Sequence, residues 1–282
     1  MTFSFGFDAL LLLMATMATG AFAGFVAGLL GVGGGIVIVP VLYHLLEFVP
    51  MDPALRMHVA VGTSLATLIP TSIRSVGSHR KRGAVDDGLL RAWRIPLALG
   101  VLAGGALAGI VSRQALVGVF ATVALVVSLH MAFGREGWRI GERLPDGLAG
   151  RAMAGVIGLL STLMGIGGGT LGVPLLTLFG YPIHRAVGTG AGLGLIIGIP
   201  GTILFAAGGI GAGPGLPAWS IGYVNLIGFL AIVPMTIWLA PYGAKAAHAL
   251  SRVMLRRAFA LFLGVTAIKL YADLFGFSVT GG

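Results

Sequence analysis

Residues 28–42 read GLLGVGGGIVIVPVL, and residues 162–176 read TLMGIGGGTLGVPLL. At one constant offset the two copies share a leucine, four glycines, a Val-Pro pair and a second leucine. Each glycine destabilises a helix by roughly 1 kcal/mol relative to alanine, and both copies lie inside long apolar stretches. The repeated phrase therefore predicts a broken membrane helix at two matched places in the chain.

The composition is that of an integral membrane protein. Of the 282 residues, 57% are hydrophobic and 10% are charged, whereas about a quarter of the residues in a soluble domain are charged. The charges fall in short clusters between apolar runs of about 20 residues, the length that crosses a bilayer as a helix. These runs are continuous rather than alternating, which favours helices over a β-barrel. The fold class predicted is an all-α integral membrane protein.

About eight transmembrane helices are expected, because eight apolar segments can be placed. They cover residues 8–47, 54–78, 92–111, 114–133, 150–180, 183–207, 218–240 and 253–275. The first and the fifth are too long for one straight crossing, and the glycine phrase divides each of them. Each is expected to form two half-helices end to end or, as the alternative, one span and a re-entrant piece.

The internal repeat extends beyond the glycine phrase. Residues 58–63 match residues 184–189 through a shared histidine and an Ala-Val-Gly-Thr run, and residues 112–121 match residues 251–260. Three matched blocks in the same order predict a 4+4 duplication within one integrated membrane domain. The two repeats are expected to occupy residues 1–140 and 141–282.

The relative orientation of the two repeats is open to two interpretations. Arginines and lysines flank the second and fourth loops, which indicates that both loops are cytoplasmic. Eight spans would then make the halves parallel, which is the leading expectation. The basic cluster at residues 245–257 disagrees, because that arrangement places it outside. A re-entrant first segment in each repeat would invert the second half and remove the conflict.

The membrane interior favours an anion as the ligand. All nine acidic residues fall in loops or near segment ends, whereas cation carriers usually place a carboxylate inside the membrane. A helix that restarts after a glycine break points its positive end and free N–H groups into the gap, where an anion can bind. The alternative is that the glycines only permit close helix packing.

The candidate substrate-binding residues combine backbone donors and hydroxyls. They are Gly33, Gly34, Gly35, Thr63, Ser64, Thr67, Gly167, Gly168, Gly169, Thr170 and Thr189. Thr71, Ser72 and Thr202 follow prolines that bend their helices and are candidates to line the same cavity. Each hydroxyl could instead bond a carbonyl of its own helix.

Several other kinds of function are not supported. The chain has no cysteine, no P-loop and no Gly-x-Ser-x-Gly elbow, so no enzyme activity, metal or cofactor is expected. The net charge of +9 resides at segment ends, where it sets topology, and does not indicate nucleic-acid binding. His44 and His130 lie deeper and are candidates for a coupling proton, with simple packing as the alternative.

These motifs resemble the TauE/SafE family of sulfite and organosulfonate exporters. The matching elements are residues 28–35, Val39-Pro40, residues 60–64, His79 and Gly83. In the second copy Gly190 replaces the serine that follows the threonine. The resemblance implies a 4+4 membrane fold and transport of small sulfur-containing anions.

The function expected is secondary transport that exports a small anion, sulfite or an organosulfonate, by alternating access. The protein would be a multi-pass protein of the cytoplasmic (inner) membrane, with the lipid bilayer and the small anion as its partners. Two alternatives remain: a passive anion channel and a membrane scaffold without transport activity.

Overall fold

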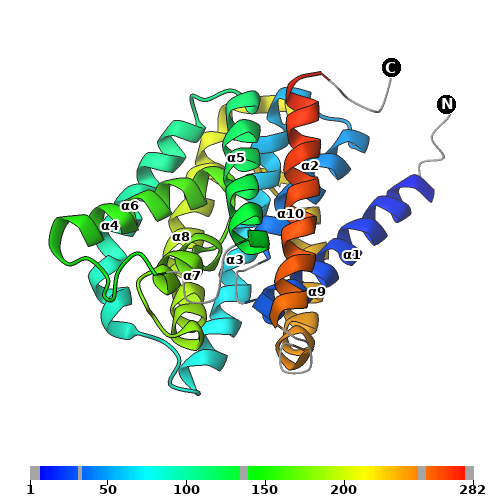
Figure 1. Cartoon of the computed structure of the whole chain (residues 1–282). Coiled ribbons are helices and arrows are strands. Elements are labelled where there is room, and N and C mark those ends of the chain that lie inside the picture. The colour runs from blue at the N-terminus through cyan, green and yellow to red at the C-terminus, as the bar shows by residue number, and fades with distance from the viewer. Residues whose placement is uncertain (1–6, 31–33, 134–138, 247–251, 277–282) are drawn as a thin grey trace.

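The computed structural model describes residues 7–30, 34–133, 139–246 and 252–276, and almost all of them are helical (Figure 1). The first half contains α1 (Phe7–Leu30), α2 (Gly35–Leu45), η1 (Leu46–Phe48), η2 (Pro53–Leu55), α3 (Arg56–Arg80), α4 (Asp87–Ala108) and α5 (Arg113–Phe133). The second half contains α6 (Gly147–Met164), α7 (Gly168–Leu178), α8 (Ile183–Gly208), η3 (Ile210–Gly215), β1 (Ser220–Ile221), β2 (Val224–Asn225), α9 (Leu226–Ala246) and α10 (Arg252–Leu274).

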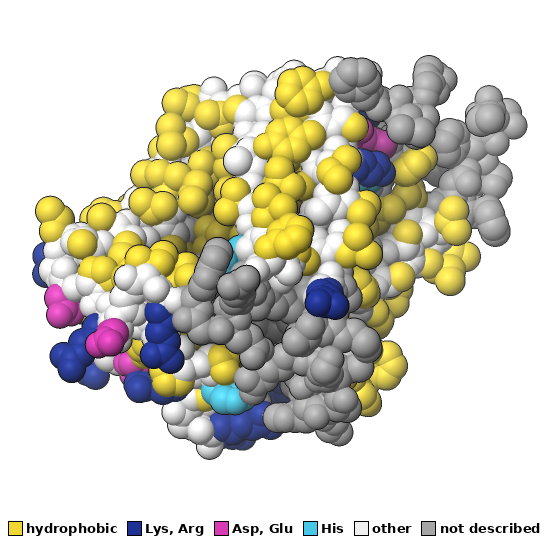
Figure 2. Space-filling model, in the orientation of Figure 1, with side chains coloured by type: hydrophobic (Ala, Val, Ile, Leu, Met, Phe, Trp, Pro, Cys, Tyr) yellow, Lys and Arg dark blue, Asp and Glu magenta, His cyan; other side chains and the backbone are white. Residues whose placement is uncertain are grey.

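The protein is an all-α integral membrane protein, as predicted. Among the described residues, seven helices are long and apolar enough to cross a membrane. Large apolar side chains cover their outer faces, for example Ile95, Leu99 and Val126, each more than half exposed. Figure 2 shows this hydrophobic surface over most of the visible face, with charged side chains gathered mainly towards its lower end. Exposed apolar surface of this extent suits contact with lipid.

Both glycine phrases interrupt a helix where the sequence predicts a break. The division is unequal, since α1 and α6 have 24 and 18 residues whereas α2 and α7 have 11 each. A helix of 11 residues is about 16 Å long, too short to cross the hydrocarbon layer. Each phrase therefore joins a longer helix to a short one, which corresponds to the alternative of one span and a shorter piece and not to two half-helices.

The seventh predicted segment also differs from the structure. A two-stranded hairpin occupies its first residues, and α9 begins at Leu226. The hairpin turns at Gly222, whose φ of 54° favours glycine. A Cβ at this position would lie 1.8 Å from the carbonyl oxygen of Ala206, so only glycine permits the close approach of the hairpin to α8.

The expectation of parallel halves is wrong. α3 and α8, which carry the matched Ala-Val-Gly-Thr run, pack antiparallel: Gly62 contacts Phe205 at one end, and His79 lies next to Gly188 at the other. Halves related by an axis along the membrane normal would hold these helices parallel. The re-entrant alternative accounts for the difference. Gly24 of α1 lies against Thr236 of α9, whereas Leu42 of α2 lies near Gly228 at the start of α9, so the chain turns back between α1 and α2. This leaves three crossings, α3, α4 and α5, in the first half.

A second matched pair of helices shows the same relationship. Thr122 of α5 lies 2.7 Å from the hydroxyl of Tyr271 in α10, and Ser128 donates to the carbonyl of Ala260 at 2.7 Å. Residue numbers rise along α5 as they fall along α10, so these helices are antiparallel too. The last turns of α9 then lie at the same end of the bundle as the last turns of α3. This removes the conflict over the basic cluster at residues 245–257.

Candidate anion-binding cavity

The two glycine breaks lie against each other at the centre of the bundle. A Cβ at Gly35 would lie 2.5 Å from the carbonyl oxygen of Gly165 and 2.9 Å from the Cα of Ile166. The hydroxyl of Ser64 donates a hydrogen bond of 2.7 Å to the same carbonyl. The absence of a side chain at position 35 therefore lets the two breaks touch, with α3 holding them together.

The second break begins with a glycine C-cap that ends α6. Gly165 adopts the left-handed conformation, with φ of 67° and ψ of 28°, and ends α6. Its N–H bonds the carbonyl of Thr162, and the N–H of Ile166 bonds that of Ser161, so the last carbonyls of α6 are satisfied. α7 then begins after Gly167 in a new direction, buried against Leu193 of α8.

A cavity of about 650 Å³ opens beside the two breaks. Gly34, the N-cap of α2, and Gly167, the N-cap of α7, both line it. The first N–H groups of a helix have no partner within the helix, and the helix dipole adds positive potential there. Two helix N-termini from the two breaks thus meet at one cavity, an arrangement that suits a small anion.

The rest of the lining combines small and apolar residues with polar and basic side chains. Its hydroxyl and charged side chains are Thr71, Ser72, Arg74, Ser75, Ser78, His79, Lys81, Arg82 and Thr236. Among the described residues that line the cavity, none is acidic. The hydroxyls and the cations both stabilise a bound anion, and a cation would find no carboxylate to pair with.

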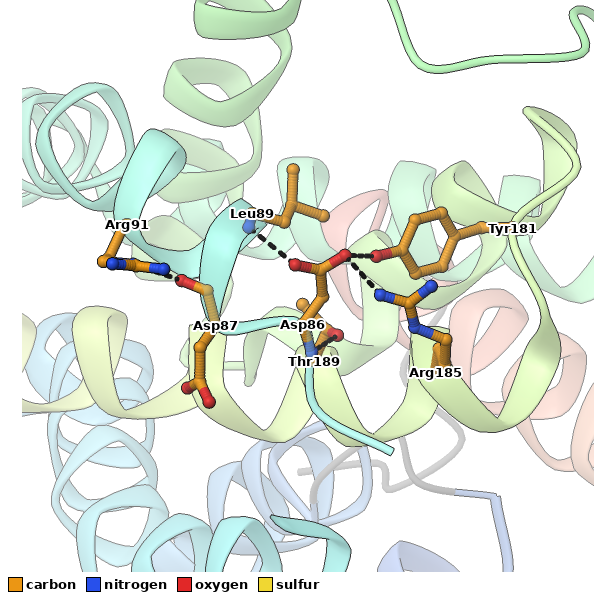
Figure 3. A network of polar contacts seen from close by, with 7 residues as sticks. All are labelled: Asp86, Asp87, Leu89, Arg91, Tyr181, Arg185 and Thr189. Atoms are coloured by element: carbon orange, nitrogen blue, oxygen red, sulfur yellow. Dashed lines mark hydrogen bonds and ion pairs between the residues drawn. The ribbon is translucent and has the colours of Figure 1, made fainter. Parts of the chain in front are cut away.

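Asp86 lies in the α3–α4 loop, which also carries the cavity residues Lys81 and Arg82. Figure 3 shows the contacts of Asp86 with its neighbours. Its carboxylate accepts hydrogen bonds from the hydroxyl of Tyr181 and, at 2.8 Å, from Arg185. Its second oxygen accepts from the N–H of Leu89 at 2.9 Å and so caps α4. This one side chain joins the α3–α4 loop to the α7–α8 connection.

The ionisation of Asp86 reflects these bonds. Burial raises the pKa of Asp86, but the bonds from Tyr181 and the Leu89 N–H, together with the charge of Arg185, outweigh burial and lower the pKa below its ordinary value. Burial and the neighbouring Asp86 carboxylate raise the pKa of Tyr181. Asp86 therefore stays ionised and Tyr181 stays a hydrogen-bond donor at neutral pH.

The predicted site residues divide into two groups. Gly34, Gly167 and Gly169 line the cavity, as do Thr71 and Ser72. Gly35 and Gly168 pack instead against the backbone and Leu193. Gly33 lies outside the described residues.

The hydroxyls predicted to bind the substrate are not among the residues that line the cavity; they are those of Thr63, Ser64, Thr67, Thr170 and Thr189. Thr63 accepts a hydrogen bond from the N–H of Asn225, and Thr189 accepts one from the N–H of Asp86. Thr67 donates to the carbonyl of Ser64, and Thr170 is buried. Thr202, also considered for the cavity, donates to the carbonyl of Gly198 in its own helix.

The sequence does not predict the basic residues of the lining as ligands. Arg74, Lys81 and Arg82 indicate only the topology when the sequence is considered alone. A signal was present, because Thr71, Ser75 and Ser78 follow each other at helical spacings of four and three and so share one face of α3. A polar stripe on an apolar segment is typical of a helix that faces an aqueous cavity.

Comparison with known proteins agrees with these observations. The family described as sulfite exporter TauE/SafE matches residues 16–270. The chain belongs to the TauE/SafE family. A probable membrane transporter protein of Haemophilus influenzae is 35% identical to this TauE/SafE protein over 255 residues, which are 90% of this chain and 96% of the relative.

More distant relatives have similar names. A probable membrane transporter protein of Methanocaldococcus jannaschii is 28% identical, over 93% of this chain and 96% of the relative. Another, YunE of Bacillus subtilis, is also 28% identical, over 90% and 94%. No solved structure matches the chain. This TauE/SafE protein is thus a multi-pass membrane protein of a transporter family.

Proposed function

We propose that this protein is a secondary transporter that exports a small sulfur-containing anion, sulfite or an organosulfonate, across the cytoplasmic membrane. One observation carries the proposal. The cavity joins the N-termini of α2 and α7 to a lining of hydroxyls, arginines and a lysine, without an acidic side chain among its described lining residues. The family name supplies the sulfur-containing class, because a cavity of this kind by itself suits many small anions.

The position of the cavity supports export from the cytoplasm. It is lined by the last turns of α3 and by Arg82 beyond them, at the basic end that the positive-inside rule assigns to the cytoplasm. At the other end of α3 the hairpin packs closely against α3 and against the end of α8. A Cβ at Gly62 would lie 2.4 Å from the carbonyl oxygen of Tyr223, and one at Gly209 would lie 2.5 Å from the backbone of Gly222.

Alternating access follows naturally from antiparallel repeats. When two similar halves have opposite orientations, exchanging their conformations turns an inward-open state into an outward-open one. The antiparallel pairs α3 with α8 and α5 with α10 provide this relationship. The anion would remain beside the glycine breaks while the halves rock around it.

The test is anion flux into liposomes that contain the purified protein. We expect saturable uptake of sulfite or of a sulfonate such as isethionate, together with counterflow from preloaded vesicles. Sulfate and chloride serve as competitors. Flux without saturation or counterflow would indicate a channel, and an absence of flux with every anion would favour the scaffold.

One pair of variants links the flux to the cavity. Arg74→Gln removes a cavity cation, whereas Arg94→Gln removes an exposed arginine of α4 that does not line the cavity. We expect Arg74→Gln to raise the half-saturating anion concentration about tenfold, a typical loss for one charge-assisted hydrogen bond. Arg94→Gln should leave it unchanged. Equal effects of the two would contradict the placement of the anion.

A further inference from the structure

A second group of titratable side chains lies at the end of the bundle away from the cavity. His44 is in the last turn of α2, Glu47 in η1 and Asp273 near the end of α10. The Nδ1 of His44 lies 3.6 Å from Oε1 of Glu47 and 3.9 Å from Oδ2 of Asp273. We call these three residues the His44 cluster.

The His44 cluster and the cavity lie at opposite ends of α3. Nη1 of Arg56, the first residue of α3, lies 3.7 Å from Glu47, whereas Arg82 at the cavity follows the last turn of the same helix. A helix of 25 residues is about 37 Å long. The two sites therefore face opposite sides of the membrane.

The His44 cluster contains an unsatisfied acceptor. The side chains of His44 and Asp273 are each 20% exposed, and that of Glu47 is 32% exposed. Oδ2 of Asp273 is buried and has no hydrogen-bond partner among the described residues. A buried carboxylate oxygen without a donor is costly, and a proton on the neighbouring imidazole would supply the donor.

The charged groups around the cluster favour a proton over a metal ion. Arg56 on α3 faces Glu47, and Lys269 on α10 acts electrostatically on His44. On the adjoining side, the hydroxyl of Tyr43 accepts a hydrogen bond of 2.9 Å from Arg113 of α5. Arg56 thus offsets the charge of Glu47, and Lys269 adds positive charge nearby, so a divalent ion would meet more repulsion than a single proton.

α2 connects the His44 cluster directly to the cavity. Gly34 caps its N-terminus and lines the cavity, and His44 lies in its last turn, about 16 Å away. Residues 35–40 of this helix are buried. Because buried residues are closely packed, a displacement of one end of α2 is transmitted to the other end. An anion at the N-terminus and a protonated histidine at the C-terminus are both favoured by the same helix dipole.

We propose that His44, Glu47 and Asp273 bind a proton that is coupled to transport of the anion. The proton passes from water to Nδ1 of His44, and the new N–H is shared with Glu47 and Asp273. By linkage, a proton that strengthens anion binding is itself bound more tightly when the anion is present. This inference rests on the proposed function, since it names the ion that is coupled to the anion.

The first experiment measures flux of isethionate, whose sulfonate remains charged throughout the range used. Lowering the pH on the side of the His44 cluster from about 7.5 to about 5.5 brackets the ordinary titration of histidine. We expect flux to rise about tenfold in the unmodified protein, within the usual range of coupling energies. His44→Gln and Asp273→Asn should carry flux that no longer depends on pH. Glu142→Gln, an exposed residue outside the cluster, should behave like the unmodified protein.

The second experiment does not require transport. We expect the thermal midpoint to differ between the two pH values by about 2–4 °C in the unmodified protein, and the difference to become smaller in His44→Gln, which retains the other five histidines. A merely structural role would lower the midpoint equally at both pH values and would overturn the proposal. Stabilisation by Zn²⁺ at constant pH, lost in the same variant, would identify a metal site instead. Isethionate flux that does not depend on pH would support the transport function and contradict the coupled proton. A pH-dependent midpoint without any flux would support proton binding at the His44 cluster and contradict the transport function.

Discussion

The backbone N–H of Asn225 donates a hydrogen bond of 2.9 Å to the hydroxyl of Thr63. The second half repeats this contact, because the N–H of Asp86 donates to Thr189 at 3.0 Å. Thr63 and Thr189 close the matched Ala-Val-Gly-Thr runs, and Asn225 and Asp86 are the residues before α9 and α4. Each half of the molecule is thus pinned to the other by the same bond.

Removing either hydroxyl should destabilise the protein and spare the cavity. Thr63→Ala leaves the N–H of Asn225, a residue only 9% exposed, without its acceptor. The expected loss is about 1–3 kcal/mol in the free energy of unfolding, measured in detergent by denaturant or heat. Thr63→Ser keeps the hydroxyl and should recover most of the stability. A large change in anion affinity with unchanged stability would show instead that Thr63 binds the substrate.

A side chain at Gly35 should disrupt the contact between the two breaks. Gly35→Ala would place its Cβ 2.5 Å from the carbonyl oxygen of Gly165, a backbone atom that is itself held by Ser64. We expect a loss of about 1–3 kcal/mol, as for other overpacked cores. The check is the thermal midpoint. A Gly35→Ala variant as stable as the parent protein would contradict the close approach of the breaks.

Gly77 offers a way to block the cavity without disturbing the packing. It lines the cavity, and a Cβ built on it meets no atom within 4 Å. Gly77→Leu should abolish most of the anion flux, while the fold persists because alanine and leucine both favour a helix over glycine. Gly77→Ala is the matched control, since it changes the helix propensity with little added volume. Full flux in the leucine variant would place the anion elsewhere.

The bond between Tyr181 and Asp86 should appear as a pH dependence of stability. Asp86 has a lowered pKa in the folded state, so it contributes stability that is present above its unfolded pKa of about 4 and is lost as the pH falls through its folded pKa. Tyr181→Phe removes one cause of that lowering. The variant should therefore be less stable than the parent at neutral pH.

The same experiment at low pH provides the control. Once Asp86 is protonated in both proteins, the stability difference caused by its charge should shrink. Thermal midpoints of the two proteins at about pH 7 and about pH 3 would show this convergence. A difference that stays constant over this range would mean that Tyr181 acts by packing alone.

The helix breaks could be predicted from the sequence, but the orientation of the halves could not. Four glycines in five residues oppose a helix wherever they occur, so the ends of α1 at Leu30 and of α6 at Met164 follow from local chemistry. The antiparallel arrangement is visible only in contacts between distant segments, such as those of Gly62 with Phe205 and of His79 with Gly188. Residues so far apart in the chain leave no local signal of their contact.

The candidate site could be predicted from the sequence only where its residues are determined by local structure. Gly34 and Gly167 reach the cavity because a helix N-terminus is determined locally. The role of Thr63 depends on Asn225, 162 positions away, and a repeated threonine looks the same in a sequence whether it binds a ligand or a backbone N–H. Arg82 resembles any cytoplasmic loop charge until the fold places it at a cavity.

The antiparallel arrangement also bears on how the chain acquires its sidedness during membrane insertion. Two halves with the same apolar pattern enter the bilayer in opposite directions, so that pattern carries no information about which end faces the cytoplasm. The connections between matched helices do differ: residues 81–86 contain Lys81 and Arg82, whereas residues 209–225 contain no lysine or arginine. Basic residues are retained on the cytoplasmic side. The orientation of the whole protein in the membrane is therefore determined by loop residues that differ between the two repeats.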